Sequence, residues 1–227
     1  IKSGVTSTLF ILLDGISGGW KDASLKYINS IFRREWIDPQ KIIRHTTRDI
    51  RNWERNGVDY HYVAESEFRK LENDDSLVYW EYYPPLSEDG EPREENKLYG
   101  ISRSALSVLK EGNGWKRVFA SVAGNGTPKV MDILDQCYKE VVWIPLYIYC
   151  NADEIEARLK SDWRPVTELL FRLNWIKNDL LNFLALEQKI QQSYLLINNS
   201  SCTDGVCESL AQNLTPITDI IGHFIVK

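Results

Sequence analysis

The stretch TLFILLDGISGGWKDASLKYINSIF, residues 8–32, decides the fold of this chain. It opens with an unbroken apolar run from Thr8 to Leu13, which has the length and character of a strand buried on both faces. A glycine-rich turn follows at residues 14–19, and apolar residues then recur at helical spacing from Ala23 to Phe32. A strand, a glycine-rich turn and a helix form the opening unit of an α/β domain that binds phosphate groups.

Outward from this unit, short apolar strands alternate with amphipathic helices, which predicts a mainly parallel sheet covered by helices. The acidic segment 84–96 contains prolines and lacks apolar periodicity, so we expect an exposed loop there. The expected strands are Lys41–His45, Tyr60–Val63, Leu77–Tyr83, Arg117–Val122, Val141–Tyr149 and Tyr194–Asn198. The expected further helices are Glu65–Glu72, Arg103–Lys110, Pro128–Gln136, Ala152–Lys160, Val166–Ile190 and Gly205–Leu214.

Length and composition exclude several classes of protein. The chain has 227 residues, of which 43% are hydrophobic, and this is enough for one domain with a substantial core. A net charge of −5 argues against a broad nucleic-acid-binding face. No apolar run approaches the roughly 18–20 residues of a membrane-spanning helix, and the first residues do not resemble a secretion signal. We therefore expect a cytoplasmic protein that binds neither nucleic acid nor membranes.

The glycine-rich turn resembles the phosphate-binding pattern GxxxxGK[ST], in which backbone N–H groups and a lysine hold phosphates and a hydroxyl binds Mg²⁺. Residues 15–22 read GISGGWKD, so the first glycine and Lys21 are in register. Trp20 replaces the second glycine, and Asp22 replaces the hydroxyl residue. Asp22 could bind Mg²⁺ directly or only stabilise the helix N-terminus. The residues expected to bind the phosphates of ATP are Gly15, Ser17, Gly18, Gly19, Lys21 and Asp22, with Asp22 also the metal ligand.

A second motif carries a resemblance to a known family. Residues 46–63, TTRDIRNWERNGVDYHYV, closely resemble the guanylate kinase signature TTRxxRxxExxGxxYxF, and the pairs Glu67-Phe68 and Tyr99-Gly100 follow as in that family. The resemblance covers nearly the whole chain. It implies a P-loop nucleoside-monophosphate-kinase-like α/β fold with a mainly parallel five-stranded core sheet, helices on both faces, a small mixed-β acceptor-binding subdomain and a helical lid.

The resemblance also implies how the chain is divided. Residues 1–227 would form one domain, with a core at about 1–43 and 103–227, an acceptor-binding subdomain at about 44–102 and a lid at about 152–175. In this family two arginines and two tyrosines hold the acceptor phosphate, and lid arginines close over the transferred group. The matching acceptor-phosphate positions are Arg48, Arg51, Tyr60 and Tyr99, and the expected catalytic residues are Lys21, Arg158, Arg164 and Arg172.

The residues that read the base do not match the family. Guanylate kinases read guanine with a serine, a glutamate and an aspartate, whose positions fall here at Arg44, Tyr79 and Ala123. Glu81, two residues after Tyr79, is the nearest carboxylate that could compensate. A carboxylate discriminates the N–H donors of guanine, so its loss predicts an acceptor other than GMP. The expected lining of the acceptor pocket is Arg44, Tyr79, Glu81 and Ser121.

A weaker resemblance points the same way. Ribose 1,5-bisphosphate phosphokinases carry an aspartate after the P-loop lysine, like Asp22 after Lys21. They also have a Tyr-Gly-Ile-Pro run, which is similar to Tyr-Gly-Ile-Ser at residues 99–102. Their acceptor contains no base, and this is compatible with the missing guanine readers.

Two functions remain open from the sequence. The first is an ATP- and Mg²⁺-dependent kinase that acts on a non-guanine nucleoside monophosphate or a sugar phosphate. The second is a catalytically inactive guanylate kinase-like module that binds a phosphorylated ligand or a protein partner. Lys21, Asp22 and the lid arginines favour the kinase, whereas Trp20 and the lost base readers favour the module. The 84–96 loop is a candidate contact for a protein partner, and a homodimer is also left open.

Overall fold

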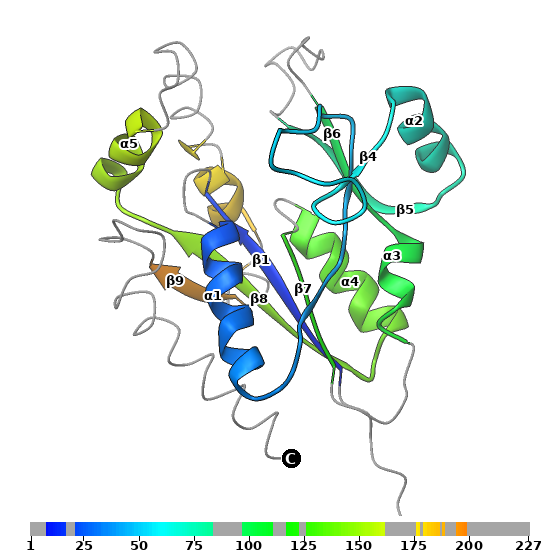
Figure 1. The fold of residues 1–227 in the computed structure, drawn as a ribbon, viewed down its shortest axis with the longest axis horizontal. Helices are drawn as coiled ribbons and strands as arrows, with labels where there is room; N and C mark the ends of the chain where they lie inside the picture. Colours follow the sequence, from blue (N-terminus) through cyan, green and yellow to red (C-terminus); the bar gives the residue numbers. More distant parts are fainter. Residues whose placement is uncertain are drawn as a thin grey trace, which may run out of the picture.

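A computed structural model describes residues 8–16, 21–83, 97–110, 117–122, 126–161, 176–177, 179–186, 188 and 194–198 (Figure 1). Its larger sheet has five strands in the order β2-β7-β1-β8-β9, and every neighbouring pair is parallel. The strands are β1 (Thr8–Gly15), β2 (Gln40–Lys41), β7 (Arg117–Val122), β8 (Val141–Tyr149) and β9 (Leu195–Asn198). This arrangement confirms the expected parallel core sheet.

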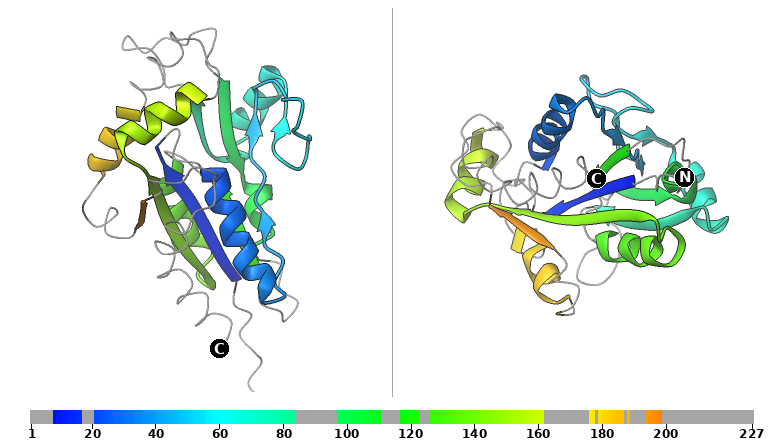
Figure 2. Two further views of the ribbon diagram at one scale, coloured as in Figure 1. Left: turned by 60° about the vertical axis from the view of Figure 1, so that its left-hand side comes forward. Right: turned by 90° about the horizontal axis from the view of Figure 1, so that it is seen from below.

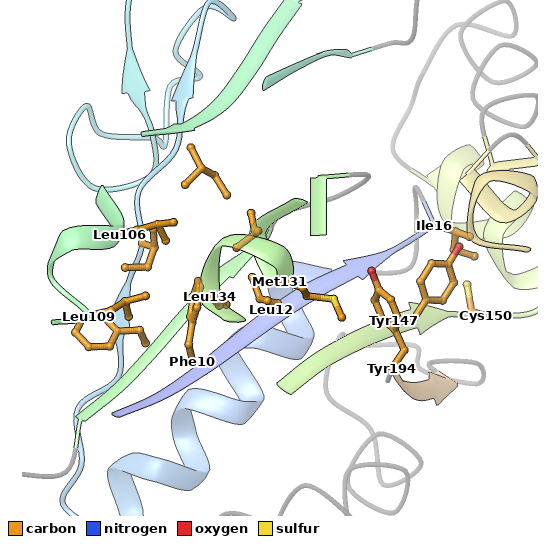
Figure 3. Close-up of a cluster of buried hydrophobic side chains, with 14 of the residues drawn as sticks. Phe10, Leu12, Ile16, Leu106, Leu109, Met131, Leu134, Tyr147, Cys150 and Tyr194 are labelled. Carbon is orange, nitrogen blue, oxygen red and sulfur yellow. The ribbon is translucent and has the colours of Figure 1, made fainter. Parts of the chain in front are cut away.

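Strand β1 is the centre of the core because both of its faces are covered. Leu9, Ile11 and Leu13 pack against helix α1 (Lys21–Arg34). Phe10 and Leu12 pack on the opposite face, against α3 (Arg103–Ser107) and α4 (Thr127–Cys137). Figure 2 shows α1 and α4 on opposite sides of the sheet, and Figure 3 shows Phe10 and Leu12 beside Met131 and Leu134. The continuous apolar run of β1 is therefore explained by burial on two sides.

The smaller sheet is mixed and has the order β4-β3-β6-β5. Its strands are β3 (His45–Thr46), β4 (His61–Tyr62), β5 (Leu77–Tyr83) and β6 (Lys97–Ser102). Strands β3 and β4 are parallel, whereas β6 is antiparallel to both β3 and β5. Helix α2 (Glu65–Asn73) covers one face by burying Phe68 against Leu77 and Leu98. The opposite face is left for polar side chains.

Some expected elements differ from the structure. The single strand expected at Lys41–His45 is wrong, because the chain leaves the larger sheet after β2 and enters the smaller sheet at β3. The helix expected to continue to Ile190 is interrupted by a turn at Ala185 and Leu186. Helix α3 ends at Ser107, three residues before the expected end, and residues 108–110 form a turn. The sequence pattern does not predict strand β6. This strand is defined mainly by its pairing with β3 and β5, which the order of residues along the chain does not reveal.

Strands β5, β7 and β8 have the bounds expected from the sequence, and the other expected elements among the described residues are found with shifted ends. Helix α5 (Ala152–Ser161) follows β8 as expected. The expected helix at Gly205–Leu214 and the acidic loop 84–96 lie outside the described residues. Within the parts of the chain that the structure describes, no helix combines the length and apolar character needed to cross a bilayer.

Gly15 ends β1 under a constraint that no other residue type satisfies. Its φ is +129°, and a Cβ added there would lie 2.1 Å from the carbonyl oxygen of Ile148. We expect Gly15→Ala to lower the free energy of unfolding by about 3 kcal/mol or more, because backbone strain and a backbone clash add. Gly57→Ala is the control: its φ is +75° but nothing lies within 4 Å of the added Cβ, so the cost should be about 1 kcal/mol. Urea unfolding of the two variants measures the difference, and equal losses would contradict the account.

Candidate functional site

One face of the smaller sheet gathers most of the polar side chains that the sequence assigned to the acceptor. Thr46 is paired with Tyr62 on β4 and with Tyr99 on β6, and Tyr99 is paired with Glu81 on β5. Directly paired residues point to the same face of a sheet, so these four side chains form one row. Residues two positions away along each chain share that face. They are Arg44, Arg48, Tyr60 and Tyr79.

Two tyrosines and Arg44 form the centre of this face. The ring centroids of Tyr60 and Tyr99 are 5.8 Å apart in an edge-to-face arrangement. The Cζ atom of Arg44 lies 5.4 Å from the centroid of the Tyr60 ring and 5.5 Å from that of Tyr99. Arg44 Nη2 also donates a hydrogen bond of 3.0 Å to the Tyr60 hydroxyl. A cation is therefore held against two phenol rings whose hydroxyls can bind an anion.

Arg48 is fixed beside this centre by an ion pair with Glu54. Its Nη1 and Nη2 atoms donate to the two carboxylate oxygens of Glu54 at 2.9 and 2.8 Å. Burial alone would raise the pKa of Glu54, but hydrogen bonds from Arg48 and from the Arg51 amide outweigh it and lower that pKa to about 2. The Arg48 Cζ atom lies 5.5 Å from the centroid of the Tyr60 ring. The two-pronged contact orients the guanidinium toward the tyrosines.

Arg51 is not part of this group in the structure. Its side chain is exposed, and its Cζ atom lies 5.9 Å from the ring centroid of Trp53, which is itself 77% exposed. Of the four residues expected at the acceptor phosphate, the structure thus brings together Arg48, Tyr60 and Tyr99 and places the guanidinium of Arg51 elsewhere. Arg44, in contrast, contacts both Tyr60 and Tyr99.

Tyr79 fills the space between β5 and the start of α4. A Cβ added to Gly126, the residue before α4, would lie 2.0 Å from the Tyr79 ring. The Lys129 ammonium lies 5.5 Å from the centroid of the same ring. The Tyr79 hydroxyl donates to Glu81 Oε2 at 2.6 Å. Only a glycine at position 126 admits this ring, which is 9% exposed.

Glu81 is a half-buried carboxyl group. Burial raises its pKa to about 7, and the negative charges of Asp14 and Asp179 add to the increase. The hydrogen bond from Tyr79 and the charge of Arg44 oppose it. Asp14 belongs to β1 of the larger sheet, and Glu81 belongs to β5 of the smaller sheet.

The carboxyl end of β1 and the first residue of α1 form the second part of the site. Lys21 begins α1, and its Nζ donates to the carbonyl oxygens of Gly15 and Ile16 at 2.8 and 3.0 Å. The lysine therefore lies across the start of the glycine-rich turn. In open α/β sheets, ligands bind at the carboxyl ends of parallel strands, and the N–H groups of a helix N-terminus favour anions.

Asp14 is a buried carboxyl group beside Lys21 that we did not single out from the sequence. It accepts a hydrogen bond of 2.6 Å from the Gly15 amide and one of 3.2 Å from the Tyr194 hydroxyl. Burial raises the pKa of Asp14 to about 6, although the Gly15 amide and the charge of Lys21 oppose the increase. Figure 3 shows Tyr194 and Tyr147 near the carboxyl end of β1.

Other residues of the site gave different sequence signals. A charged residue that ends a fully apolar strand is a local signal that could have identified Asp14. Glu54 lies inside the family signature and could have been found as the partner of Arg48. Asp179 and Tyr194 both act on Asp14, but each lies more than 160 residues from it along the chain. Nothing near these two residues in the sequence indicates that they approach Asp14.

The expected lid and metal residues are only partly described. Arg158 lies on α5 and is 6% exposed; it forms an ion pair of 3.1 Å with Glu154 and contacts the Cys150 thiol. Asp22, the expected metal ligand, is the second residue of α1. Ser121, which the sequence placed in the acceptor pocket, lies in β7, where its backbone is paired with Leu12 of β1. Ser17, Gly18, Gly19, Trp20, Arg164 and Arg172 lie outside the described residues.

Magnesium fits this site as a partner of bound phosphates. The described side chains include no group of three His, Cys, Asp or Glu residues that could enclose a metal ion. Mg²⁺ needs no such enclosure, because it commonly binds one or two carboxylates together with substrate phosphates and water. Asp22 follows directly after Lys21, so its place in the sequence suits that role.

The raised pKa of Asp14 predicts a pH effect on stability. The pKa of Asp14 in the folded state is raised to about 6, whereas the ordinary pKa of this carboxyl group is 3.8. As pH rises between these values, the unfolded chain ionises first, and the free energy of unfolding must fall. Relative to Asp14→Asn, the wild type should lose on the order of 2–3 kcal/mol between pH 4 and pH 7.

Denaturant unfolding at several pH values measures this loss. The exposed Asp132→Asn substitution is the matched control for removing one carboxylate. A constant difference between wild type and Asp14→Asn over the whole range would contradict the buried, protonated carboxyl group.

Comparison with known proteins identifies the family. No family model matches the chain. A guanylate kinase of Campylobacter jejuni strain RM1221 is 34% identical over 228 aligned residues, covering 92% of this chain and 95% of that protein. A guanylate kinase of Oceanobacillus iheyensis is 29% identical over 191 residues, covering 82% of each chain.

A solved structure agrees on the fold. The crystal structure of a guanylate kinase from Anaplasma phagocytophilum superimposes with a TM-score of 0.52 at 15% identity, covering 99% of this chain and 88% of that one. That likeness supports the P-loop kinase fold, and the longer sequence match supports the family resemblance seen in residues 46–63. This chain belongs to the guanylate kinase family.

Proposed function

We propose that the chain is an ATP-dependent phosphotransferase whose acceptor is a small phosphorylated molecule other than GMP. Membership of the guanylate kinase family supports phosphoryl transfer from ATP to a phosphorylated acceptor. The acceptor is either a non-guanine nucleoside monophosphate or a sugar phosphate. In this proposal residues 44–102 bind the acceptor, and residues 1–43 and 103–227 bind ATP and supply the lid.

The ATP side rests on the end of β1 and the start of α1. Lys21 is positioned to exchange its two carbonyl partners for phosphate oxygens and to neutralise their charge. Asp22 would hold Mg²⁺, which supplies further positive charge to the phosphates when bound. Gly15 brings the backbone close to Ile148 and directs the chain into the turn that would surround the phosphates.

The acceptor side orients one phosphate group. Arg48, fixed by Glu54, presents its guanidinium next to the hydroxyl-bearing rings of Tyr60 and Tyr99. An oxygen of the acceptor would attack the γ-phosphorus of ATP, and the bond from that phosphorus to the bridging oxygen would break, releasing ADP. Such a transfer needs positioning and charge stabilisation more than covalent catalysis. The described residues supply both.

The position of Tyr79 carries the proposal that GMP is not the acceptor. Tyr79 stands where the family has its base-reading glutamate, and its ring packs on Gly126, three residues after the position of the family's base-reading aspartate. We infer that the Tyr79 ring would occupy the space in which a guanine would meet both carboxylates. Glu81 accepts a hydrogen bond from that phenol. These contacts favour an acceptor that has no purine, and a sugar phosphate fits best.

A phosphotransfer assay with ATP, Mg²⁺ and a panel of acceptors tests the proposal. The panel contains GMP, AMP, CMP, UMP, ribose 5-phosphate and ribose 1,5-bisphosphate. We expect the best acceptor to have a kcat/KM at least about tenfold above that of GMP, since a site lacking the base-reading groups loses their discrimination. Lys21→Met should lower the rate about 100-fold or more, because it removes a charge from the transferred phosphate.

Each other outcome of the assay has a defined meaning. GMP as the best acceptor would refute the assignment of the acceptor. No transfer to any acceptor, with no calorimetric binding of ATP–Mg²⁺, would refute the kinase and favour the inactive binding module. Binding of ATP that is unaffected by Lys21→Met would show that the ATP site is wrongly placed.

A further inference from the structure

Arg44 occupies a place in the site that the family resemblance does not explain. By sequence it stands at the position of a base-reading serine. In the structure it contacts the two tyrosines expected at the acceptor phosphate, through a hydrogen bond to Tyr60 and through its position over both rings. It therefore belongs geometrically to the phosphate-binding residues and not to a separate base pocket.

The guanidinium of Arg44 has hydrogen-bonding capacity left for a ligand. Arginine has five N–H donors, and among the described residues the Tyr60 hydroxyl accepts one of them. No described carboxylate forms an ion pair with Arg44; the charge of Glu81 acts on it only from farther away. Arg48 differs, because its two terminal nitrogens are both bound to Glu54. Arg44 is thus the arginine of this face with the larger number of donors left for an anion.

Arg44 and Arg48 both contact the ring of Tyr60. Their Cζ atoms lie 5.4 and 5.5 Å from the centroid of the same ring, that of Tyr60. Arg51, which the resemblance assigns to the phosphate, lies over the exposed Trp53. A phosphate ester has enough oxygens to accept from two guanidinium groups and from tyrosine hydroxyls together.

We propose that Arg44 is a ligand of the acceptor phosphate and acts with Arg48 in the role that the family resemblance assigns to Arg51. This inference rests on the proposed function, since it concerns the acceptor of that reaction. The acceptor site then consists of Arg44, Arg48, Tyr60 and Tyr99, which are joined by their contacts on one face of the smaller sheet. It selects a phosphorylated acceptor by its phosphate, and Tyr79 restricts what is attached to that phosphate.

Binding of inorganic phosphate and of ribose 5-phosphate to the full chain, measured by calorimetry without ATP, tests the inference. Arg44→Met keeps the aliphatic stem and removes the charge, and Arg51→Met is the matched control. We expect Arg44→Met to weaken both ligands about 10- to 100-fold, the range for losing charge-assisted hydrogen bonds, and Arg51→Met to weaken them less than about threefold. Arg44→Lys should retain part of the affinity. Thermal unfolding checks that each variant is folded.

Several results would overturn the inference. These are a wild type that binds neither ligand, an Arg44→Met variant that binds like the wild type, or a greater loss in Arg51→Met. The double variant Arg44→Met/Glu81→Gln separates direct binding from charge balance: recovery of affinity would mean that Arg44 only neutralises Glu81, which also overturns it. Because no ATP is present, Arg44-dependent phosphate binding would stand even if the kinase assay failed. An active kinase with Arg44-independent binding would leave the proposed function intact.

Discussion

The register of the smaller sheet is the constraint on which the candidate site depends. Thr46, Tyr99 and Glu81 are direct partners across β3, β6 and β5, so their side chains share one face. A shift of one residue in the pairing of β6 would turn Tyr99 toward α2 and bring Gly100 to the site. Gly100 prevents this, because its missing side chain leaves room for Phe68, which a Cβ would approach to 3.0 Å. The packing of α2 therefore fixes the position of Tyr99 in the candidate site.

The charges of the site are balanced locally. Glu54 neutralises Arg48 in a direct two-pronged ion pair, whereas Arg44 feels Glu81 only at longer range. Asp14 and Glu81 avoid the cost of buried charge by retaining protons to higher pH, as their raised pKa values of about 6 and about 7 show. Below about pH 6 the region around these two groups therefore carries less negative charge than its carboxyl groups suggest.

Sequence patterns predicted the parts of this structure that depend on local order. The apolar run of β1, the helix after it and the signature at residues 46–63 identified the fold, and the signature contains Arg48 and Tyr60 of the candidate site. They did not reveal that Arg44 joins the tyrosines, because residues 42–44 read as a continuous strand and the crossing between sheets is a tertiary feature. Likewise, the ring of Tyr79 over Gly126 joins segments 47 residues apart. Contacts of this kind depend on packing between elements, which the spacing of residues along the chain does not encode.

The central claim is that the acceptor site holds a phosphate while Tyr79 excludes a guanine. A crystal structure of the protein with a non-hydrolysable ATP analogue, Mg²⁺ and saturating GMP tests it most directly. The account predicts phosphate density among Arg44, Arg48, Tyr60 and Tyr99, with the Tyr79 ring still packed on Gly126 and no base in that space. A guanine lying between β5 and α4, with Tyr79 displaced and Glu81 bound to its N–H groups, would contradict it.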